Sequence, residues 1–242
     1  MNIQPDQSLR EVAAQSAQAV RVLEDYRIDY CCGGQRTFGE ACGAKGLDWQ
    51  RIAQEIGTAG QTVAADQPDW NTASLSKLIE HILAAHHEYL RQELPRLADR
   101  LARVQKAHPQ DALVLSSLAK VYQALHRELD GHLPTEEQIL FPFVEQMASA
   151  AANPRPGAAL PFGTFQNPIR VMQHEPEDAG QALAEIRRLT GDFTLPPHAC
   201  DTYRALYTGL QALERDLHQH IHLENNILFP RALALEARQI QK

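Results

Sequence analysis

The sequence of 242 residues lacks most features that mark secreted, membrane-spanning or nucleic-acid-binding proteins. Its 4 cysteines include two neighbours, which is a poor disulfide framework for a secreted chain of this length. Polar residues interrupt every apolar run well short of the roughly 18 residues that cross a membrane, and the opening residues do not resemble a signal peptide. A formal net charge of -7 without a dense Lys/Arg run argues against nucleic acid or an anionic membrane as partner. We therefore expect a soluble cytoplasmic protein with reduced thiols.

What the sequence has instead is helical patterning, which begins with short helices near the N-terminus. Ser8 and Glu11 have the spacing of a helix-capping box, and Thr37 and Glu40 repeat it. Between these two helix starts lies the segment Asp29-Tyr30-Cys31-Cys32-Gly33-Gly34, which its glycines predict to be a turn. The N-terminal region is therefore predicted to be a small helical unit.

The rest of the chain has the periodicity of long amphipathic helices and no strand-type alternation. The expected helices span residues 75–106, 112–147, 167–189 and 199–239. Four long amphipathic helices joined by loops predict an all-α, up-down four-helix bundle. The predicted divisions of the chain are a small helical domain over residues 1–57, a linker over 58–71 and the bundle over 72–242.

Two of the long helices carry the same motif, H-x-x-x-E-(E/N)-x-I-L-F-P. Its copies contain His132 with Glu136 and His220 with Glu224, so in each copy the two side chains project from one helix face about one turn apart. A carboxylate on an apolar stripe is costly without a partner, and metal ligation supplies one. Since a carboxylate has two oxygens, it can also bridge two metals across a bundle. Histidine and carboxylate ligands suit iron or manganese.

Two further histidines are candidate ligands, one on the first long helix and one just past its end. His87 lies on the inward stripe. His108 follows 21 residues later, which is about six helical turns and places it on the same side if the helix persists. A single H-x-x-x-E motif is more often a solvated ion pair than a metal site. Two copies on apolar stripes of different helices, with His87 in addition, favour the metal site.

Together these features resemble the hemerythrin-like di-iron proteins, and among them the iron-sulfur cluster repair (repair-of-iron-centres) family, over nearly the whole chain. The turn at residues 29–34, followed by Cys42, is similar to the small cysteine-bearing domain of that family, and the repeated motif matches its bundle. The resemblance implies a di-iron centre of two non-haem iron ions, for which manganese is a possible substitute. The implied metal ligands are the terminal His87, His132 and His220, the bridging Glu136 and Glu224, and His108 as a further ligand or near neighbour.

One position departs from the family pattern. Where the third bundle helix of the family presents a ligand histidine, this chain has Pro176 at the inward position and His174 two residues before it. Proline cannot ligate a metal and removes a helical N–H. The site therefore either keeps an open position, which would admit water or a small diatomic ligand, or recruits His174 through a local kink.

Cys31 and Cys32 are the candidate functional thiols. Adjacent cysteines beside two glycines predict an exposed turn, and neighbouring thiols take up nitric oxide, bind soft iron or copper, or exchange disulfides with a partner. Cysteine is also often a small buried hydrophobe. We give that structural interpretation to Cys200, while Cys42 is a candidate third thiol.

The resemblance also implies a function: repair of iron-sulfur clusters damaged by nitrosative or oxidative stress. Damaged iron-sulfur proteins would be the partners and nitric oxide or oxygen the small ligands, with iron supply or nitric oxide removal as the mechanism. Two alternatives stay open. One is a di-iron nitric oxide reductase that takes electrons from the thiols, and the other is an oxygen or nitric oxide sensor whose thiol domain is the output. A homodimer is compatible with the family.

Overall fold

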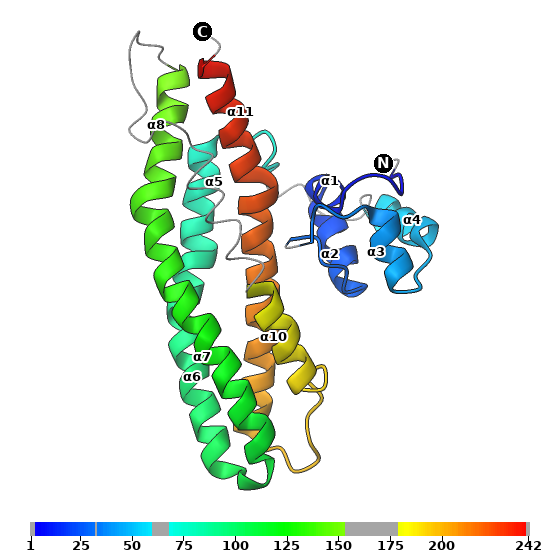
Figure 1. Cartoon of the computed structure of the whole chain (residues 1–242), viewed down its shortest axis with the longest axis vertical. Coiled ribbons are helices and arrows are strands. Elements are labelled where there is room, and N and C mark those ends of the chain that lie inside the picture. The colour runs from blue at the N-terminus through cyan, green and yellow to red at the C-terminus, as the bar shows by residue number, and fades with distance from the viewer. Residues whose placement is uncertain (1–2, 32, 60–67, 153–178, 241–242) are drawn as a thin grey trace.

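A computed structural model describes residues 3–31, 33–59, 68–152 and 179–240, and these residues form a helical structure (Figure 1). Within them, the β-pairing is one isolated bridge between Ser8 and Thr37. The all-α prediction is therefore confirmed. None of the described helices is long and apolar enough to cross a membrane.

Short helices make up the N-terminal unit. They are α1 (Leu9–Ala14), α2 (Ala17–Asp25), α3 (Phe38–Ala44) and α4 (Trp49–Ala59). Both predicted capping boxes are present: the Ser8 hydroxyl accepts from the N–H of Glu11 while the Glu11 carboxylate accepts from the N–H of Ser8, and Thr37 and Glu40 do the same. Each box satisfies backbone donors that a helix start leaves without partners. The bridge between Ser8 and Thr37 joins these two starts.

Three long helical rods and a shorter helix make up the rest of the described chain (Figure 1). The first rod consists of α5 (Leu75–His81), η1 (Ile82–His87) and α6 (Glu88–Ala107). After η2 (Pro109–Asp111), the second consists of α7 (Ala112–Thr135), η3 (Glu136–Leu140) and α8 (Phe141–Ala152). The third consists of α10 (Asp201–His222), η4 (Leu223–Leu228) and α11 (Phe229–Ile240).

The shorter helix, over residues 179–189, lies against α10 and is tied to it by Arg187, whose Nε donates to Glu214 at 2.9 Å. The three rods match the expected helices over residues 75–106, 112–147 and 199–239. The first part of the remaining expected helix, residues 167–178, lies outside the described residues.

A short π-helical segment interrupts each rod, and these segments are η1, η3 and η4. The segments η3 and η4 both run into a Phe-Pro pair, with Pro142 and Pro230 as the second residue. A proline inside a helix lacks the N–H, and its ring clashes with the carbonyl of the preceding turn. A wider π turn before the proline relieves that clash, and such turns are frequent at functional sites.

The apolar core of the bundle is divided into two clusters. On the first rod, Ile82 belongs to one cluster and Leu90 to the other. On the third rod, Ile227 and Leu217 are divided in the same way. The level between the two clusters is the level of the π-helical segments, and it is occupied by buried polar side chains.

The N-terminal unit packs against η4 through the turn that contains Tyr30. Asn226 of η4 donates from Nδ2 to the backbone oxygen of Tyr30 at 3.0 Å and accepts at Oδ1 from Arg10 Nε at 3.0 Å. The Tyr30 ring meets the ring of His222 edge-on, with centroids 5.4 Å apart. A Cβ atom at Gly34 would lie 2.8 Å from the carbonyl oxygen of Tyr30, so this close approach requires glycine.

Candidate metal centre

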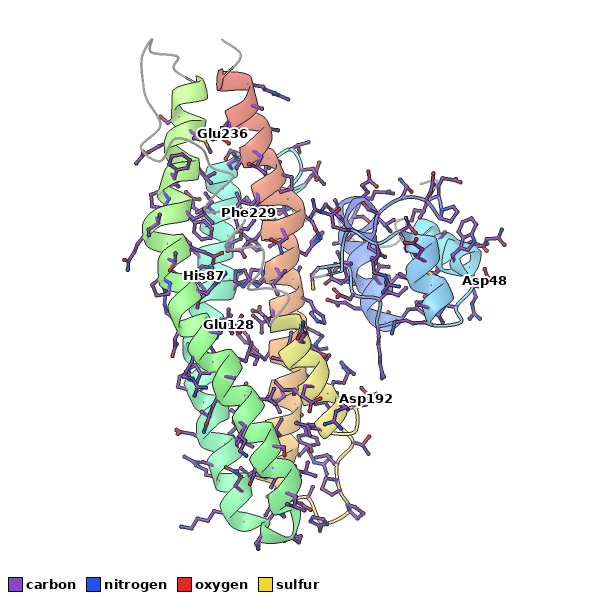
Figure 2. The ribbon with its side chains drawn as sticks, in the orientation of Figure 1. Asp48, His87, Glu128, Asp192, Phe229 and Glu236 are labelled. Atoms are coloured by element: carbon purple, nitrogen blue, oxygen red, sulfur yellow. The ribbon has the colours of Figure 1, made fainter. Side chains whose placement is uncertain are left out.

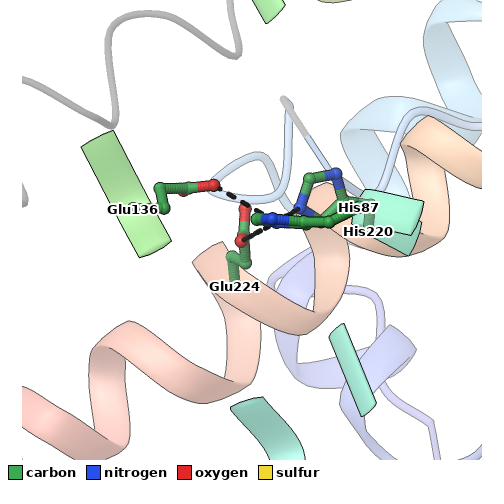
Figure 3. A group of neighbouring side chains, drawn as sticks. All are labelled: His87, Glu136, His220 and Glu224. Carbon is green, nitrogen blue, oxygen red and sulfur yellow. Dashed lines mark hydrogen bonds and ion pairs between the residues drawn. The ribbon is translucent and has the colours of Figure 1, made fainter. Parts of the chain in front are cut away.

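Four side chains from the three rods converge at the level of the π-helical segments (Figure 3). His87 ends η1, Glu136 begins η3, and His220 and Glu224 lie one turn apart where α10 meets η4. The residues are 0%, 0%, 1% and 3% exposed, and His87 lies well inside the bundle (Figure 2). One ligand atom of each lies within 4.8 Å of those of the other three. The fold thus brings together residues that are far apart in the sequence.

The distances within this group are short enough for shared metal ligation. His220 Nε2 is 3.0 Å from Glu224 Oε1 and 3.2 Å from His87 Nε2. His87 Nε2 is in turn 3.5 Å from Glu136 Oε2. His132 approaches from the second rod, with its Nε2 3.0 Å from Glu136 Oε1. In both copies of the motif, therefore, the imidazole Nε2 faces the carboxylate of the same copy.

Burial affects the two glutamates of the group differently. It raises the pKa of Glu136, and the charge of Glu224 raises that pKa further. Burial alone would also raise the pKa of Glu224, but His220 and His87 outweigh it and hold this pKa below its ordinary value. The pKa of His220, which burial lowers, is raised overall by the two carboxylates. Without a metal, the charge of Glu224 is thus compensated by His220 and His87, whereas burial and Glu224 disfavour the charged form of Glu136.

The unsatisfied atoms of the group show that a cation fits here. Neither oxygen of Glu136 accepts a well-formed hydrogen bond from any described residue. Since a buried polar atom without such a bond costs free energy, its presence calls for another partner. A cation between the carboxylates and the facing Nε2 atoms would be that partner. Imidazole and carboxylate donors without thiolate are typical of iron or manganese sites rather than of soft metals.

A carboxylate behind His87 completes the arrangement, and the sequence reasoning missed it. Nδ1 of His87 is 2.7 Å from Oε1 of Glu137, and Arg91 donates to both oxygens of the same carboxylate. Burial would raise the pKa of Glu137, but the hydrogen bonds from His87 and Arg91 hold it below its ordinary value. A carboxylate on Nδ1 directs Nε2 to the metal and strengthens the imidazole as a ligand. The sequence did contain a sign of this role. Glu137 is a second acidic residue directly after Glu136, whereas the second motif copy has Asn225 at the equivalent position.

A second supporting side chain, that of His86, lies beside His220. The ring of His86 stacks on that of His220, with centroids 5.6 Å apart and an interplanar angle of 7°. Its Nδ1 is 2.9 Å from Oδ1 of Asp216. His86 therefore packs against a candidate ligand without offering a ligand atom to the group itself.

The prediction that His108 joins the ligands needs correction. The first rod does continue to Ala107, as expected, and His108 follows it directly. However, the 21 residues after His87 correspond to roughly 30 Å of rise along the helix axis. His108 lies instead beside Cys200, with 3.2 Å between Nε2 and Sγ. The shared helix face therefore predicts the side of the bundle on which His108 lies, but His108 lies too far along the helix axis to reach the group.

The described thiols also differ from the expectation. Cys31 is 4% exposed, so the prediction of an exposed turn is wrong for this residue. Its Sγ lies 3.4 Å from Oδ1 of Asp29, within the turn that Tyr30 and Asn226 hold against the bundle. The sequence could not show this contact, because it joins residues that are far apart in the chain.

Of the remaining candidate residues, the structure describes two cysteines. Cys42 is buried, which raises its pKa. Cys200, for which we expected a structural role in the interior, is exposed. Cys32, His174 and Pro176 lie outside the described residues, so the ligand that replaces the missing histidine stays a prediction.

Fold and site together define a class of protein: a helical bundle with a buried cation-binding group of histidines and carboxylates. In agreement with this, residues 78–232 match the family described as Hemerythrin HHE cation binding domain. Residues 5–60 match a second family, described as Domain of Unknown function (DUF542). The two matches cover the bundle and the N-terminal unit, respectively.

Similar proteins specify the family further. The chain is 39% identical over 234 residues to the Iron-sulfur cluster repair protein YtfE of Citrobacter koseri, covering 96% of this chain and 98% of that protein. It is 38% identical, with the same coverage, to proteins of that name from Escherichia coli and Shigella boydii. The chain therefore belongs to the YtfE family of iron-sulfur cluster repair proteins, and the resemblance noted in the sequence is confirmed.

Proposed function

We propose that the buried group holds two non-haem iron ions in a di-iron centre, which manganese could replace. The proposed ligands are the terminal His87, His132 and His220 and the bridging Glu136 and Glu224. The observation that supports this most is Glu136, which is fully buried beside a second carboxylate and lacks a well-formed hydrogen bond to any described residue. Two buried carboxylates need more compensating charge than one protonated imidazole provides. The irons, when bound, would supply redox chemistry and a site for diatomic ligands.

The chain's own residues would orient the ligands and exclude water. Glu137 and Arg91 hold His87 so that its Nε2 faces the centre. The Phe141 ring lies 5.5 Å from the His87 ring, and the two apolar clusters enclose the polar level on either side. For the position of the missing histidine we propose open coordination beside Pro176, with ligation by His174 as the alternative.

We propose that the protein repairs iron-sulfur clusters damaged by nitrosative or oxidative stress, the repair role stated in the names of its relatives. Its partners would be damaged iron-sulfur proteins in the cytoplasm, where thiols stay reduced. In the proposed division, residues 1–57 supply the thiols of Cys31 and Cys32, residues 58–71 link the domains, and residues 72–242 hold the metal. The contact of Asn226 with the backbone of Tyr30 supports this division, since it places the cysteine turn against the π-helical segment of Glu224. A homodimer stays a prediction that solution size measurement would test.

The first experiment measures iron per chain, with optical and paramagnetic spectra, on protein purified without oxygen. We expect about two irons with a spin-coupled signal, because two bridging carboxylates couple the metals. Glu136→Ala and Glu224→Ala should each remove the coupled signal. Glu88→Ala is the matched control, since Glu88 is an exposed carboxylate next to His87 in sequence. One iron or none in the parent chain would overturn the di-iron proposal.

A second experiment separates repair from the alternatives. A client whose [4Fe-4S] cluster has been damaged by nitric oxide is incubated with the parent chain, with Glu224→Ala, and with the Cys31→Ser/Cys32→Ser variant after its iron content has been checked. Recovery of client activity that requires both the centre and the thiols supports repair with thiol participation. Catalytic consumption of nitric oxide without client recovery would instead identify a reductase. Stoichiometric nitric oxide binding alone would identify a sensor.

A further inference from the structure

A second group of metal-ligating side chains lies at one end of the bundle, remote from the proposed di-iron centre. His108 closes α6, and Asp111 immediately precedes α7. His198 and Cys200 come from the connection that leads into α10, for which Cys200 is the residue before the first helical turn. Figure 1 shows both connections at the end of the bundle opposite the C-terminus. Two segments about ninety positions apart in the chain therefore present ligand-type atoms to one another.

The distances in this group are close to those between ligands of one ion. His108 Nε2 is 3.2 Å from Cys200 Sγ, and His198 Nε2 is 2.8 Å from Asp111 Oδ2. His108, Asp111 and His198 each offer one atom within 4.8 Å of those of the other two. Cys200 is not one of these three residues and reaches them through its contact with His108. Around a tetrahedral zinc ion, neighbouring nitrogen, oxygen and sulfur ligands are about 3.3–3.6 Å apart, as follows from the metal–ligand bond lengths. The two contacting pairs are within a few tenths of an ångström of these distances, and an ion would in addition draw the two pairs toward each other.

Neighbouring side chains hold His108 in place, and the other side of the group is open to solvent. His108 is 6% exposed, and its ring packs against Tyr203 with centroids 5.1 Å apart. Its Nδ1 lies 3.3 Å from the side-chain nitrogen of Gln110, which leaves Nε2 directed at Cys200. His198 and Cys200 are exposed, so an ion can enter without opening the core.

We propose that His108, Asp111, His198 and Cys200 bind one divalent ion of the zinc class, separate from the buried centre. Two imidazoles, a carboxylate and a thiolate are a borderline-soft donor set that suits zinc and excludes magnesium or calcium. The ion would join the corner between α6 and α7 to the start of α10 and so fix the end of the bundle. The competing interpretation is an ion pair between His198 and Asp111 and a separate contact between His108 and Cys200, with no metal.

Cobalt(II) is the probe, because its thiolate complexes absorb in the near ultraviolet and imidazole–carboxylate complexes do not. The full chain is titrated with its buried centre already loaded with iron and in a Cys31→Ser/Cys32→Ser background, which removes the two adjacent thiols of the N-terminal unit. We expect one cobalt per chain with thiolate charge-transfer absorption, and displacement of that absorption by one equivalent of zinc. Absence of the absorption from folded protein, or failure of zinc to displace it, would overturn the proposal.

Two variants assign the ligands, with one control. Cys200→Ser should abolish the charge-transfer absorption, and His198→Ala should weaken cobalt binding by at least about tenfold, the smallest loss typical of disturbed metal ligation. His198 is exposed, so its replacement leaves the fold intact, which circular dichroism verifies. Cys42→Ser, at a thiol outside the group, should change nothing. Absorption that persists in Cys200→Ser would place the cobalt elsewhere and overturn the assignment.

Discussion

The two copies of the H-x-x-x-E motif present the same ligands inward and differ in what their other faces contact. In the first copy, Glu137 accepts hydrogen bonds from His87 and Arg91, and Ile139 is 48% exposed. In the second copy, Asn225 and Asn226 are 8% and 7% exposed. One copy thus supports a ligand from a neighbouring rod, while the other forms the surface on which the N-terminal unit packs.

The inward faces are unequal too, despite their shared sequence. Glu224 has His220 at 3.0 Å within its own copy and His87 at 3.9 Å from the first rod. Glu136 has His132 at 3.0 Å, yet burial and the charge of Glu224 dominate its pKa. An internal repeat therefore predicts which atoms are presented to the metal, whereas the surroundings of each copy shift the pKa values of the two carboxylates in opposite directions.

The largest expected effect tests this inequality through matched replacements in the metal-free chain. At pH 7, Glu224→Gln should reduce the free energy of unfolding by about 3 kcal/mol, because it leaves a buried charged imidazole without its partner. Glu136→Gln should change it by less than about 1 kcal/mol, since the amide removes a charge that burial and Glu224 already disfavour. Urea unfolding of chelator-treated protein measures both.

The sign of each effect follows from the pKa directions. The low pKa of Glu224 contributes stability that is present above its ordinary value of 4.5 and is lost as the pH falls. The raised pKa of Glu136 contributes stability that is present below 4.5 and is lost as the pH rises through the folded-state value. Equal losses for the two variants at pH 7 would show that the two copies are electrostatically equivalent.

The next effect tests the packing surface of the second copy. Asn226→Leu removes the hydrogen bonds to Tyr30 and Arg10 and leaves a buried carbonyl without its donor, so it should cost about 2–3 kcal/mol. Gln138→Leu, at the equivalent position of the first copy, is exposed and should change stability by no more than about 0.5 kcal/mol. Hydrogen exchange in α1 and α2 checks whether the loss arises in the N-terminal unit. Similar costs at the two positions would contradict the assigned difference between the copies.

What the sequence predicts correctly is what local spacing determines. Capping boxes depend on residues three apart, and the inward faces of His132 with Glu136 and of His220 with Glu224 depend on residues four apart. Both kinds of prediction survive because a helix repeats the same geometry wherever it is placed. The predicted helices and the inward direction of the two motif copies follow from this repeated geometry.

What the sequence does not predict depends on contacts between distant segments. The phase of a helix places His108 on the correct side, but the level of each residue in the bundle has to be counted along the axis as well. The burial of Cys31 depends on Asn226, nearly two hundred positions later. Glu137 resembles a surface residue until His87 and Arg91 of another rod are placed beside it.

A smaller effect tests the supporting face of the first copy. Glu137→Ala should weaken iron binding by about 10–100-fold, because His87 loses the carboxylate that orients it and strengthens it as a ligand. Glu88→Ala removes an exposed carboxylate next to His87 in sequence and should leave the affinity unchanged. Competition with a coloured chelator measures both under anaerobic conditions. Unchanged affinity in Glu137→Ala would mean that packing alone orients His87.

The smallest effect concerns the partner of the second copy, Tyr30, whose hydroxyl donates to Glu24 Oε1 at 2.7 Å. Burial raises the pKa of Glu24 despite this hydrogen bond, so its stabilising contribution is present below its ordinary value of 4.5 and is lost as the pH rises. Glu24→Gln keeps an acceptor for Tyr30 and removes the buried charge. Because the side chain is partly exposed, solvent screening limits the expected gain at pH 7 to about 0.5 kcal/mol. Thermal unfolding should show this gain at pH 7 and none at pH 4, and a loss at pH 7 would mean that the charged carboxylate strengthens the packing of Tyr30.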